Sequence, residues 1–342
     1  DFRAAWSTFC WNLSIGFLRQ GLLDKGWSLY DHGLRVAAAG QQKYQRSLKK
    51  FFTSSQLKIW DGNCSSDFKL LIVGEQGIGD SMMFGTLIPQ LTNFNMKITF
   101  VPGDRLVEIY KRSFKDIEIL THSEMLTRQA EDFDAQIPAG TLPRLLCSGQ
   151  TGYLRSNEYL KADISKTKAF REELLRLTGK KFLVGISWSG GGKKERVPKK
   201  SVDLRLMASE LLRCEGGIVS LQYGNTKKVI DLVNEKLDTN IICREDVNPL
   251  QDMDTWLSLV DACDVVLTVA NTTVHGSCGL GKETYVVLTE LADWRWIKEK
   301  EGSSYWYPSA RVKQIGTDKK WKTKIGECVD EINAKFCSSR SC

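Results

Sequence analysis

Short apolar runs alternate with amphipathic stretches of helical length from residue 69 onward, and this alternation is the strongest constraint on the fold. KLLIVGE and MKITFVP have the length and composition of buried strands, whereas DRLVEIYKRSF has the apolar spacing of a helix. IEIL and DFDAQIPAG continue the alternation. Because strands that alternate with helices usually pair in parallel, this part of the chain is expected to form a parallel α/β sheet.

The same pattern restarts in the second half of the chain. Residues 165–180, SKTKAFREELLRLTGK, are expected to form a helix with a linker. The strand candidates after it are KFLVGISW, GGIVSLQYG, NIICRE, DACDVVLTVA and ETYVVLT. The order predicts two α/β halves, each with its own sheet. Ligands of such sheets bind at the carboxyl ends of the strands, so we expect the binding site in a cleft between the halves.

The N-terminal residues have a helical pattern instead. Trp6, Cys10, Leu13, Phe17 and Leu18 recur at three- and four-residue spacing, and helix is predicted from about residue 4 to residue 50. A glycine turn and a second amphipathic segment make this a helix-turn-helix unit. One such unit cannot bury both of its faces, so we expect it to end a helical-repeat array or to dock a protein partner.

A chain of 342 residues is long for a single core and comfortable for two domains. The predicted boundaries are a helical segment over residues 1–60, an N-terminal α/β domain over residues 67–165, and a C-terminal α/β domain with a final helix over residues 180–342. A linker is expected between the two α/β domains.

Charge and cysteine content narrow the class of protein. A formal net charge of +7 is compatible with an anionic ligand but does not by itself indicate nucleic acid, and a basic protein without an anionic partner remains an alternative. Ten scattered cysteines without a CxxC motif disfavour a zinc site or a dense disulfide framework, and they favour reduced thiols in the cytoplasm. No apolar run reaches the roughly 18 residues that predict a transmembrane segment.

The first candidate site is LLIVGEQGIGDSMMF, where an apolar run enters a glycine-rich loop. Gly74, Gly77 and Gly79 have the spacing GxxGxG, the reverse of the dinucleotide fingerprint GxGxxG, which disfavours a nicotinamide-binding oxidoreductase. Glycines allow the backbone to approach a ligand or a facing loop closely. Asp80 is expected at the start of the following helix, either as a helix cap or as a functional carboxylate.

The second candidate is SWSGGGKKERVPKKS, in which three glycines and several cations follow a predicted strand. Flexible backbone together with Lys193, Lys194 and Arg196 suits a diphosphate. A solvated loop or a basic nucleic-acid patch is the alternative. Interleaved aromatic residues are lacking, so nucleic acid is not expected as a partner.

The third candidate is VANTTVHGSCGLGKETYVVL, which is close to a Walker A motif. Glu283 stands where that motif requires Ser or Thr, and a helix start is the better interpretation. Asn271, Thr272 and Thr273 supply capping side chains, and free N–H groups at such a helix start bind phosphate. His275 is expected to donate to the same anion, or to be a buried structural histidine.

The fourth candidate is ADWRWIKEKEGSSYWYPS, residues 292–309, where many aromatic residues lie in a charged segment. A rigid wall of a cleft, a platform for a base and ordinary core packing all remain open. No HExxH or GxSxG motif and no Cys/His pairing supports a hydrolase of those classes.

Several of these stretches together resemble a known family. VGEQGIGDSMMF, VGISWSGG, VSLQYG, VANTTVHGSCGLGK and DWRW with SYWYPS look like the glycosyltransferase-like domain that follows tetratricopeptide repeats in many bacterial proteins. That domain is similar to the heptosyltransferases and, more distantly, to the O-linked N-acetylglucosamine transferases (O-GlcNAc transferases). FLRQGLLDKGWSLYDHGLRV resembles the last repeat helices before it. The match covers most of residues 10–325, and its ordered set of motifs is specific.

The resemblance implies a GT-B-type α/β fold, with two Rossmann-like domains facing a cleft and a short helical N-terminal segment. It implies a nucleotide-sugar donor held mainly by the second domain, with no cofactor and no essential metal. Asp80 matches the family's proposed general base, and Gly77 and Gly79 would then lie near the acceptor. The donor-phosphate motif matches Asn271, Thr272, Thr273 and His275. Gln222 and Tyr223, in LQYG, would lie beside the nucleotide.

Two departures from the family pattern bear on activity. Many relatives carry Asp five residues before this histidine, where Ala270 stands here. Relatives also often carry an acidic residue soon after the YG pair. In this sequence the first acidic residue after that pair is Asp231, at least one helical turn later. With these departures noted, the resemblance implies a metal-independent, inverting glycosyltransferase, of hexosyl or heptosyl type, acting on a glycan or protein hydroxyl. The alternative is a non-catalytic GT-B-like binding module associated with helical repeats.

Overall fold

The computed structural model describes residues 2–36, 46, 50–147, 158–191, 200–296, 302–316 and 320–338. It divides the chain into two compact units. The first unit is Asp1–Tyr159 together with Asp293–Glu299, and the second is Leu160–Ala292 together with Lys300–Cys342. A short segment from late in the sequence therefore belongs to the first unit.

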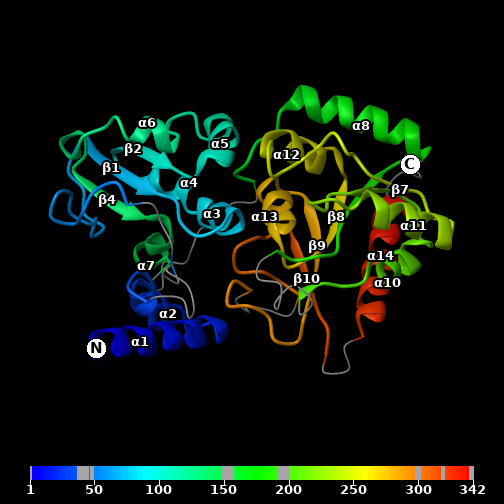
Figure 1. The fold of residues 1–342 in the computed structure, drawn as a ribbon, viewed down its shortest axis with the longest axis horizontal. Coiled ribbons are helices and arrows are strands. Elements are labelled where there is room, and N and C mark those ends of the chain that lie inside the picture. The colour runs from blue at the N-terminus through cyan, green and yellow to red at the C-terminus, as the bar shows by residue number, and fades with distance from the viewer. Residues whose placement is uncertain are drawn as a thin grey trace. The chain divides into compact units, whose positions relative to one another are not determined.

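The first unit contains a parallel sheet with strand order β3-β2-β1-β4 (Figure 1). Its strands are β1 (Phe68–Val73), β2 (Met96–Val101), β3 (Glu118–Ile119) and β4 (Ala135–Pro138). Its helices are α1 (Phe2–Arg19), α2 (Leu23–Tyr30), α3 (Ile78–Gly85), α4 (Ile88–Leu91), α5 (Val107–Ser113), α6 (His122–Met125) and α7 (Leu142–Leu146).

Strand β1 occupies an interior position in this sheet because its sequence is apolar on both faces. Leu70, Leu71 and Ile72 are fully buried, and Leu70 pairs in register with Ile98 of β2 and Ala135 of β4. The chain order reverses between β1 and β4. Loops that leave such neighbouring strands diverge at their carboxyl ends, which is where open α/β sheets bind ligands.

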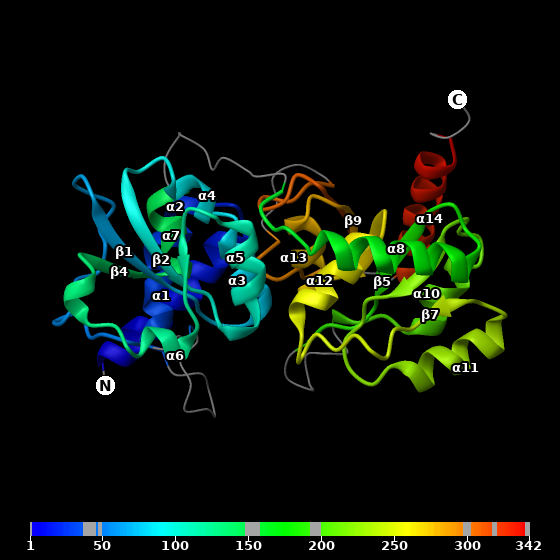
Figure 2. The same ribbon diagram turned by 90° about the horizontal axis from the view of Figure 1, so that it is seen from above.

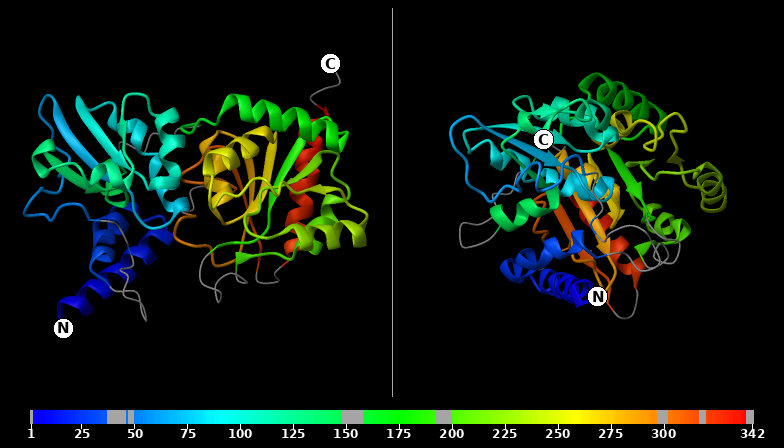
Figure 3. Two further views of the ribbon diagram at one scale, coloured as in Figure 1. Left: turned by 45° about the horizontal axis from the view of Figure 1, so that its top comes forward. Right: turned by 60° about the vertical axis from the view of Figure 1, so that its left-hand side comes forward.

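The N-terminal helices α1 and α2 form a hairpin (Figure 3). Leu18 is fully buried, and the Ser14 hydroxyl donates to the Gly26 carbonyl at 2.8 Å, so small residues bring the two helices close together. Trp6 and Leu13 are 52% and 37% exposed. The buried residues of α1 are instead Ser7, Cys10, Trp11, Ser14 and Leu18.

The helix predicted from about residue 4 to residue 50 is confirmed as α1 and α2 up to Tyr30. A 3-10 turn, Asp31–Leu34, follows. Residues 37–45 and 47–49 lie outside the described residues.

The second unit contains a parallel sheet with strand order β10-β9-β8-β5-β6-β7. Its strands are β5 (Leu183–Ser187), β6 (Gly217–Ser220), β7 (Ile241–Ile242), β8 (Val265–Val269), β9 (Glu283–Leu288) and β10 (Ala310–Gln314). Its helices are α8 (Ile164–Thr178), α10 (Leu204–Leu211), α11 (Lys227–Leu237), α12 (Met253–Ala262), α13 (Thr272–Gly279) and α14 (Trp321–Ser338).

Helices cover both faces of this second sheet (Figure 2). Helices α10, α11 and α14 share one core with the strands, through buried residues such as Met207, Ile230 and Val329. Helix α8 packs against α12, and α13 packs against β8 and β9. Within the described ranges, no helix combines the length and apolar character needed to cross a membrane.

Candidate functional site

Asn271 joins the carboxyl ends of β5 and β8, where the strand order of the second sheet reverses. It is the N-cap of α13, and its Oδ1 accepts from the Thr273 N–H at 2.9 Å. Its Nδ2 donates to the Ser187 hydroxyl and, at 3.1 Å, to the Ser189 carbonyl. The predicted capping role is confirmed, and the same side chain also fixes the loop that leaves β5.

Gln222 holds that loop from the other side. Its Oε1 accepts from the backbone N–H groups of Trp188 at 3.0 Å and Ser189 at 2.8 Å, and its Nε2 donates to the Ser189 carbonyl at 3.3 Å. Two predicted site residues, Gln222 and Asn271, therefore meet at Ser187 and Ser189. Their amides shape the carboxyl edge of β5, β6 and β8.

His275 lies in α13, close to the helix start, and its side chain is buried. Its Nδ1 lies 2.8 Å from the Tyr307 hydroxyl, and the two ring centroids are 5.7 Å apart. Tyr307 is itself 1% exposed, so the imidazole has a fixed orientation. The buried histidine that the sequence left as an alternative is confirmed, while its role toward an anion stays a prediction.

Of the other residues predicted to bind the donor, the structure describes some and leaves others outside its described ranges. Thr272 and Tyr223 are half-buried, and the Tyr223 hydroxyl approaches Gly191 so closely that a Cβ there would lie 2.7 Å from it. Lys193 and Lys194 lie outside the described residues. In the described part of the chain, no group of His, Cys, Asp and Glu side chains is arranged to hold a metal ion.

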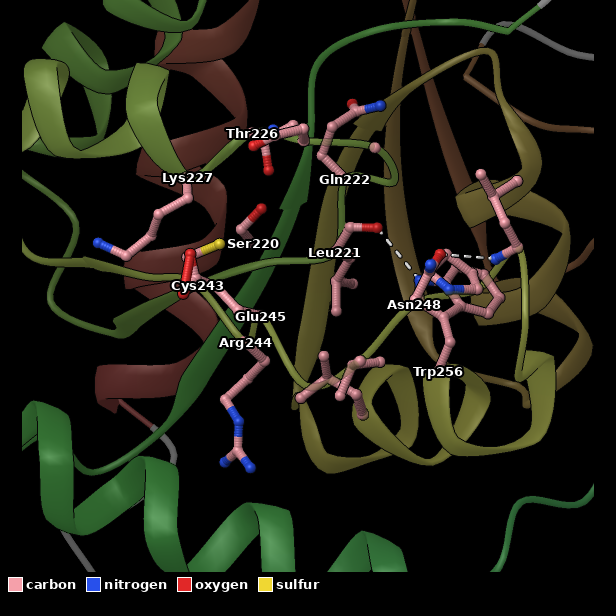
Figure 4. Close-up of a pocket in the computed structure, with 16 residues that line it drawn as sticks. Ser220, Leu221, Gln222, Thr226, Lys227, Cys243, Arg244, Glu245, Asn248 and Trp256 are labelled. Carbon is pink, nitrogen blue, oxygen red and sulfur yellow. Dashed lines mark hydrogen bonds between the residues drawn. The ribbon is translucent and has the colours of Figure 1, made fainter.

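A pocket of about 350 Å³ opens beside Gln222, between the loops that follow β6 and β7 and the helix α12 (Figure 4). Trp256 forms part of its wall and donates its indole N–H to the Leu221 carbonyl at 3.1 Å. The Ser220 hydroxyl is buried and has no hydrogen-bond partner among the described residues. Lys227 lines the rim and is ion-paired with Asp231, so the acid nearest the YG pair is already engaged.

In the first unit, Asp80 lies in the first turn of α3, whose N-cap is Gly77. Its Oδ2 accepts from the Gly77 N–H at 3.4 Å, so Asp80 contributes to the helix start from the third helical position, and the interpretation that Asp80 is itself the N-cap is wrong. Gly79 is the second residue of the same helix. The close approach predicted for the glycines occurs at Gly74, where a Cβ would lie 2.6 Å from the Pro102 carbonyl oxygen.

The Asp80 carboxylate has a partner that the sequence did not predict. Arg295 donates its Nε–H to Asp80 Oδ1 at 2.5 Å, and its Nη1 donates to Asp293 at 2.7 Å. The aromatic segment 292–309 therefore contributes a side chain to a candidate site residue in each unit. Arg295 reaches Asp80 in the first unit, and Tyr307 reaches His275 in the second.

Sequence reasoning missed Arg295, Tyr307 and the pocket wall at Trp256 as site residues. The available signal was the position of the arginine between two tryptophans in DWRW, because an arginine held by an aromatic face is oriented for a specific partner. The sequence reasoning weighed the aromatic residues of that segment and left its arginine unassigned.

The two parallel sheets with helices on their faces define the GT-B-type class of α/β fold, preceded here by N-terminal helices. The chain is similar to E. coli ADP-heptose LPS heptosyltransferase II, with a TM-score of 0.53 and 13% identity over 80% of this chain and 100% of that one. It is also similar to a glycosyl transferase family 9 protein from Veillonella parvula, with a TM-score of 0.52 and 11% identity over 82% of this chain and 100% of that one. At these identities the likeness shows the fold.

Among curated proteins, the chain is similar to Protein FlbA of Caulobacter vibrioides, with 23% identity over 328 residues. The match covers 90% of this chain and 52% of FlbA, so the chain spans about half the length of that relative. No family model matches the chain.

Proposed function

We propose that this protein is a glycosyltransferase that moves a sugar from a nucleotide-sugar donor to a hydroxyl of a glycan or protein acceptor. Donor binding is assigned to the second unit and the general base to the first. Transfer inverts the anomeric configuration and needs no metal, because amides at a helix start and nearby cations stabilise the leaving diphosphate.

The observation that carries this proposal is the pocket beside Gln222. Its volume of about 350 Å³ falls within the roughly 300–1,000 Å³ of small-molecule sites. It lies at the carboxyl end of β6, where α/β sheets bind nucleotides. The buried Ser220 hydroxyl has no partner in the part of the chain that the structure describes, and such a group costs free energy until a ligand supplies one. A nucleoside offers hydroxyls and ring nitrogens that meet this need.

The start of α13 supports placing the diphosphate near Asn271. The N-terminus of this eight-residue helix carries partial positive charge, and its first N–H groups lack intrahelical partners. His275 lies on the same helix, and its Nδ1 is within hydrogen-bond distance of the Tyr307 hydroxyl. These groups would stabilise negative charge as the diphosphate leaves. Lys193 and Lys194 are assigned to the same anion on sequence grounds alone.

Asp80 is proposed to accept the proton of the acceptor hydroxyl as that oxygen attacks the anomeric carbon. The acceptor oxygen forms the new bond to the sugar, the bond from the sugar to the diphosphate breaks, and the diphosphate leaves with its electron pair. The Asp80 carboxylate, which Arg295 binds through Oδ1, takes up the acceptor proton as the attacking oxygen loses electron density to the new bond.

The test is thermal unfolding against nucleoside diphosphates and nucleotide sugars, each with and without EDTA. One nucleotide is expected to raise the melting temperature, with no change on adding EDTA. Ser220→Ala is expected to leave the unliganded protein at least as stable and to weaken that effect, because it removes the unpaired hydroxyl. Arg171→Gln, in an ion pair with Asp264 elsewhere in the second unit, is the matched control. No shift with any nucleotide would overturn the proposal.

A second candidate is a non-catalytic GT-B-like binding module. Two observations favour it: Ala270 offers no carboxylate in front of α13, and Asp80 is engaged by both Arg295 and the Gly77 N–H. This candidate predicts a folded protein without nucleotide affinity and without hydrolysis of any nucleotide sugar.

A further inference from the structure

The segment around Arg295 is anchored firmly in the first unit. Trp294 is 5% exposed, and its ring lies 5.3 Å from that of Tyr30 and 6.0 Å from that of Trp27, between ring centroids. The Arg295 guanidinium stacks on the Trp294 ring at 4.4 Å. A flexible side chain that is stacked in this way can adopt few orientations. Packing therefore fixes the direction of the Arg295 fork, the planar set of N–H donors of its guanidinium.

The fork makes three polar contacts. Its Nε donates to Asp80, its Nη1 to Asp293, and its Nη2 to Gln76 Oε1 at 3.3 Å. Burial disfavours the charged form of Arg295, but Asp80 and Asp293 outweigh it and raise the pKa of this arginine above its ordinary range. Arg295 is therefore a cation at neutral pH.

Gln76 links this fork to a second buried network. Its φ of +60° is in the left-handed region that non-glycine residues seldom adopt, which marks a position held by its surroundings. Its Nε2 donates to the Tyr30 hydroxyl at 2.9 Å and to Glu75 at 3.1 Å. Arg46, whose side chain is fully buried, binds both carboxylate oxygens of Glu75 at 2.8 Å and 2.6 Å.

The two oxygens of the Asp80 carboxylate therefore differ in their hydrogen-bond partners. Oδ1 accepts from Arg295 at 2.5 Å, whereas within the described residues Oδ2 has only a long contact of 3.4 Å to the Gly77 N–H. Asp80 retains an exposed fraction of 14% in its side chain. Oδ2 is thus the oxygen suited to receive a proton.

We propose that Arg295 is the positioning residue of the transfer reaction: it binds Asp80 Oδ1 and thereby turns Oδ2 toward the acceptor hydroxyl. The inference rests on the proposed function, since it assigns Arg295 a task only if Asp80 is the base. Gln76 and the stacked Trp294 hold Arg295 in place, and Arg295 itself does not contact the reacting atoms.

The test compares Arg295→Gln and Arg295→Lys with the wild type, with kcat, the KM for the donor and the melting temperature as readouts. Arg295→Gln is expected to lower kcat at least tenfold, with the KM for the donor unchanged. Arg295→Lys keeps the charge but not the forked guanidinium, so it should recover only part of kcat.

Arg171→Gln is the control, because Arg171 makes a comparable forked ion pair with Asp264 in the second unit. It is expected to lower stability without changing kcat. A merely structural role for Arg295 predicts the same behaviour in Arg295→Gln: a lower melting temperature with unchanged kcat. That outcome overturns the positioning role and leaves the proposed function standing. A wild type that neither binds nucleotide nor transfers sugar overturns both.

Discussion

At the scale of single residues, Asp80 combines a local structural task with a proposed chemical one. Replacement by Asn keeps an oxygen that accepts from the Gly77 N–H but removes the negative charge that pairs with Arg295. We expect Asp80→Asn to lower transfer by about 100-fold or more, the usual worth of a general base, while nucleotide-induced stabilisation stays unchanged.

The control for this variant is Asp104→Asn in the same unit, because Asp104 also accepts a backbone N–H, from His122 at 2.8 Å. Its turnover should match that of the wild type. Unchanged turnover in Asp80→Asn would remove Asp80 from the mechanism, while a lost response to nucleotide would mean that the variant acts through the fold.

The cysteines give a residue-scale prediction about pH. Burial raises the pKa of Cys263, Cys278 and Cys328 to about 12 from the ordinary value of 9.0. At pH 8 only about one such thiol in ten thousand is ionised, and the thiolate is the reactive form. We expect Ellman's reagent to label exposed Cys64 quickly and these three only on unfolding.

The same pKa shifts have a definite sign for stability. The thiols ionise near pH 9 in the unfolded chain and near pH 12 in the folded one, so their contribution is fully present below pH 9 and is lost as the pH rises toward 12. The free energy of unfolding, measured by urea titration, should fall across this window. A flat profile between pH 9 and pH 11 would contradict the assignment.

At the scale of elements, the sequence predicts best where a strand is buried on both faces. The interior strands β1, β2, β5, β6, β8 and β9 each correspond to an apolar run, because a strand covered by helices on both sides needs a continuous one. Strand β10, ARVKQ, was missed because it lies at the sheet edge and carries polar residues that edge positions tolerate. Arg295 was missed for another reason: its bond to Asp80 spans 215 positions, and no local pattern encodes such a contact.

Helix α13 offers an element-scale prediction through its N-cap. Asn271→Ala removes the cap and the bonds to Ser187 and Ser189, so we expect stability to fall by about 1–2 kcal/mol. Nucleotide affinity should fall as well, because the first turn of α13 and the loop after β5 lose their fixed geometry. Isothermal titration with the nucleotide found by thermal unfolding measures this.

The matched control is Asp203→Ala, because Asp203 caps α10 in the same unit by accepting from the Arg205 N–H at 2.7 Å. It should lose about 1 kcal/mol of stability and keep its nucleotide affinity. Equal losses of affinity in both variants would show that capping affects binding only through general stability.

At the scale of the whole molecule, the chain does not complete one unit before it starts the other. It leaves the first unit after Tyr159, returns for Asp293–Glu299, and then completes the second unit. The returning segment brings Trp294 into the core of the first unit, while Trp306, 1% exposed, is buried in the second. Two tryptophans twelve positions apart therefore stabilise different units.

This division predicts opposite patterns of hydrogen exchange for two similar variants. Trp294→Ala removes the ring that packs on Trp27 and Tyr30, so amides of α2 and α3 should exchange faster, with a local loss of about 3–5 kcal/mol. Trp306→Ala should instead speed exchange in the second unit. Hydrogen exchange followed by mass spectrometry reports on both units in one sample. The division would be contradicted if the same peptides lost protection in both variants.

Trp294→Ala should also affect turnover, because Arg295 stacks on Trp294. We expect it to reproduce the lower kcat of Arg295→Gln, whereas Trp306→Ala should not.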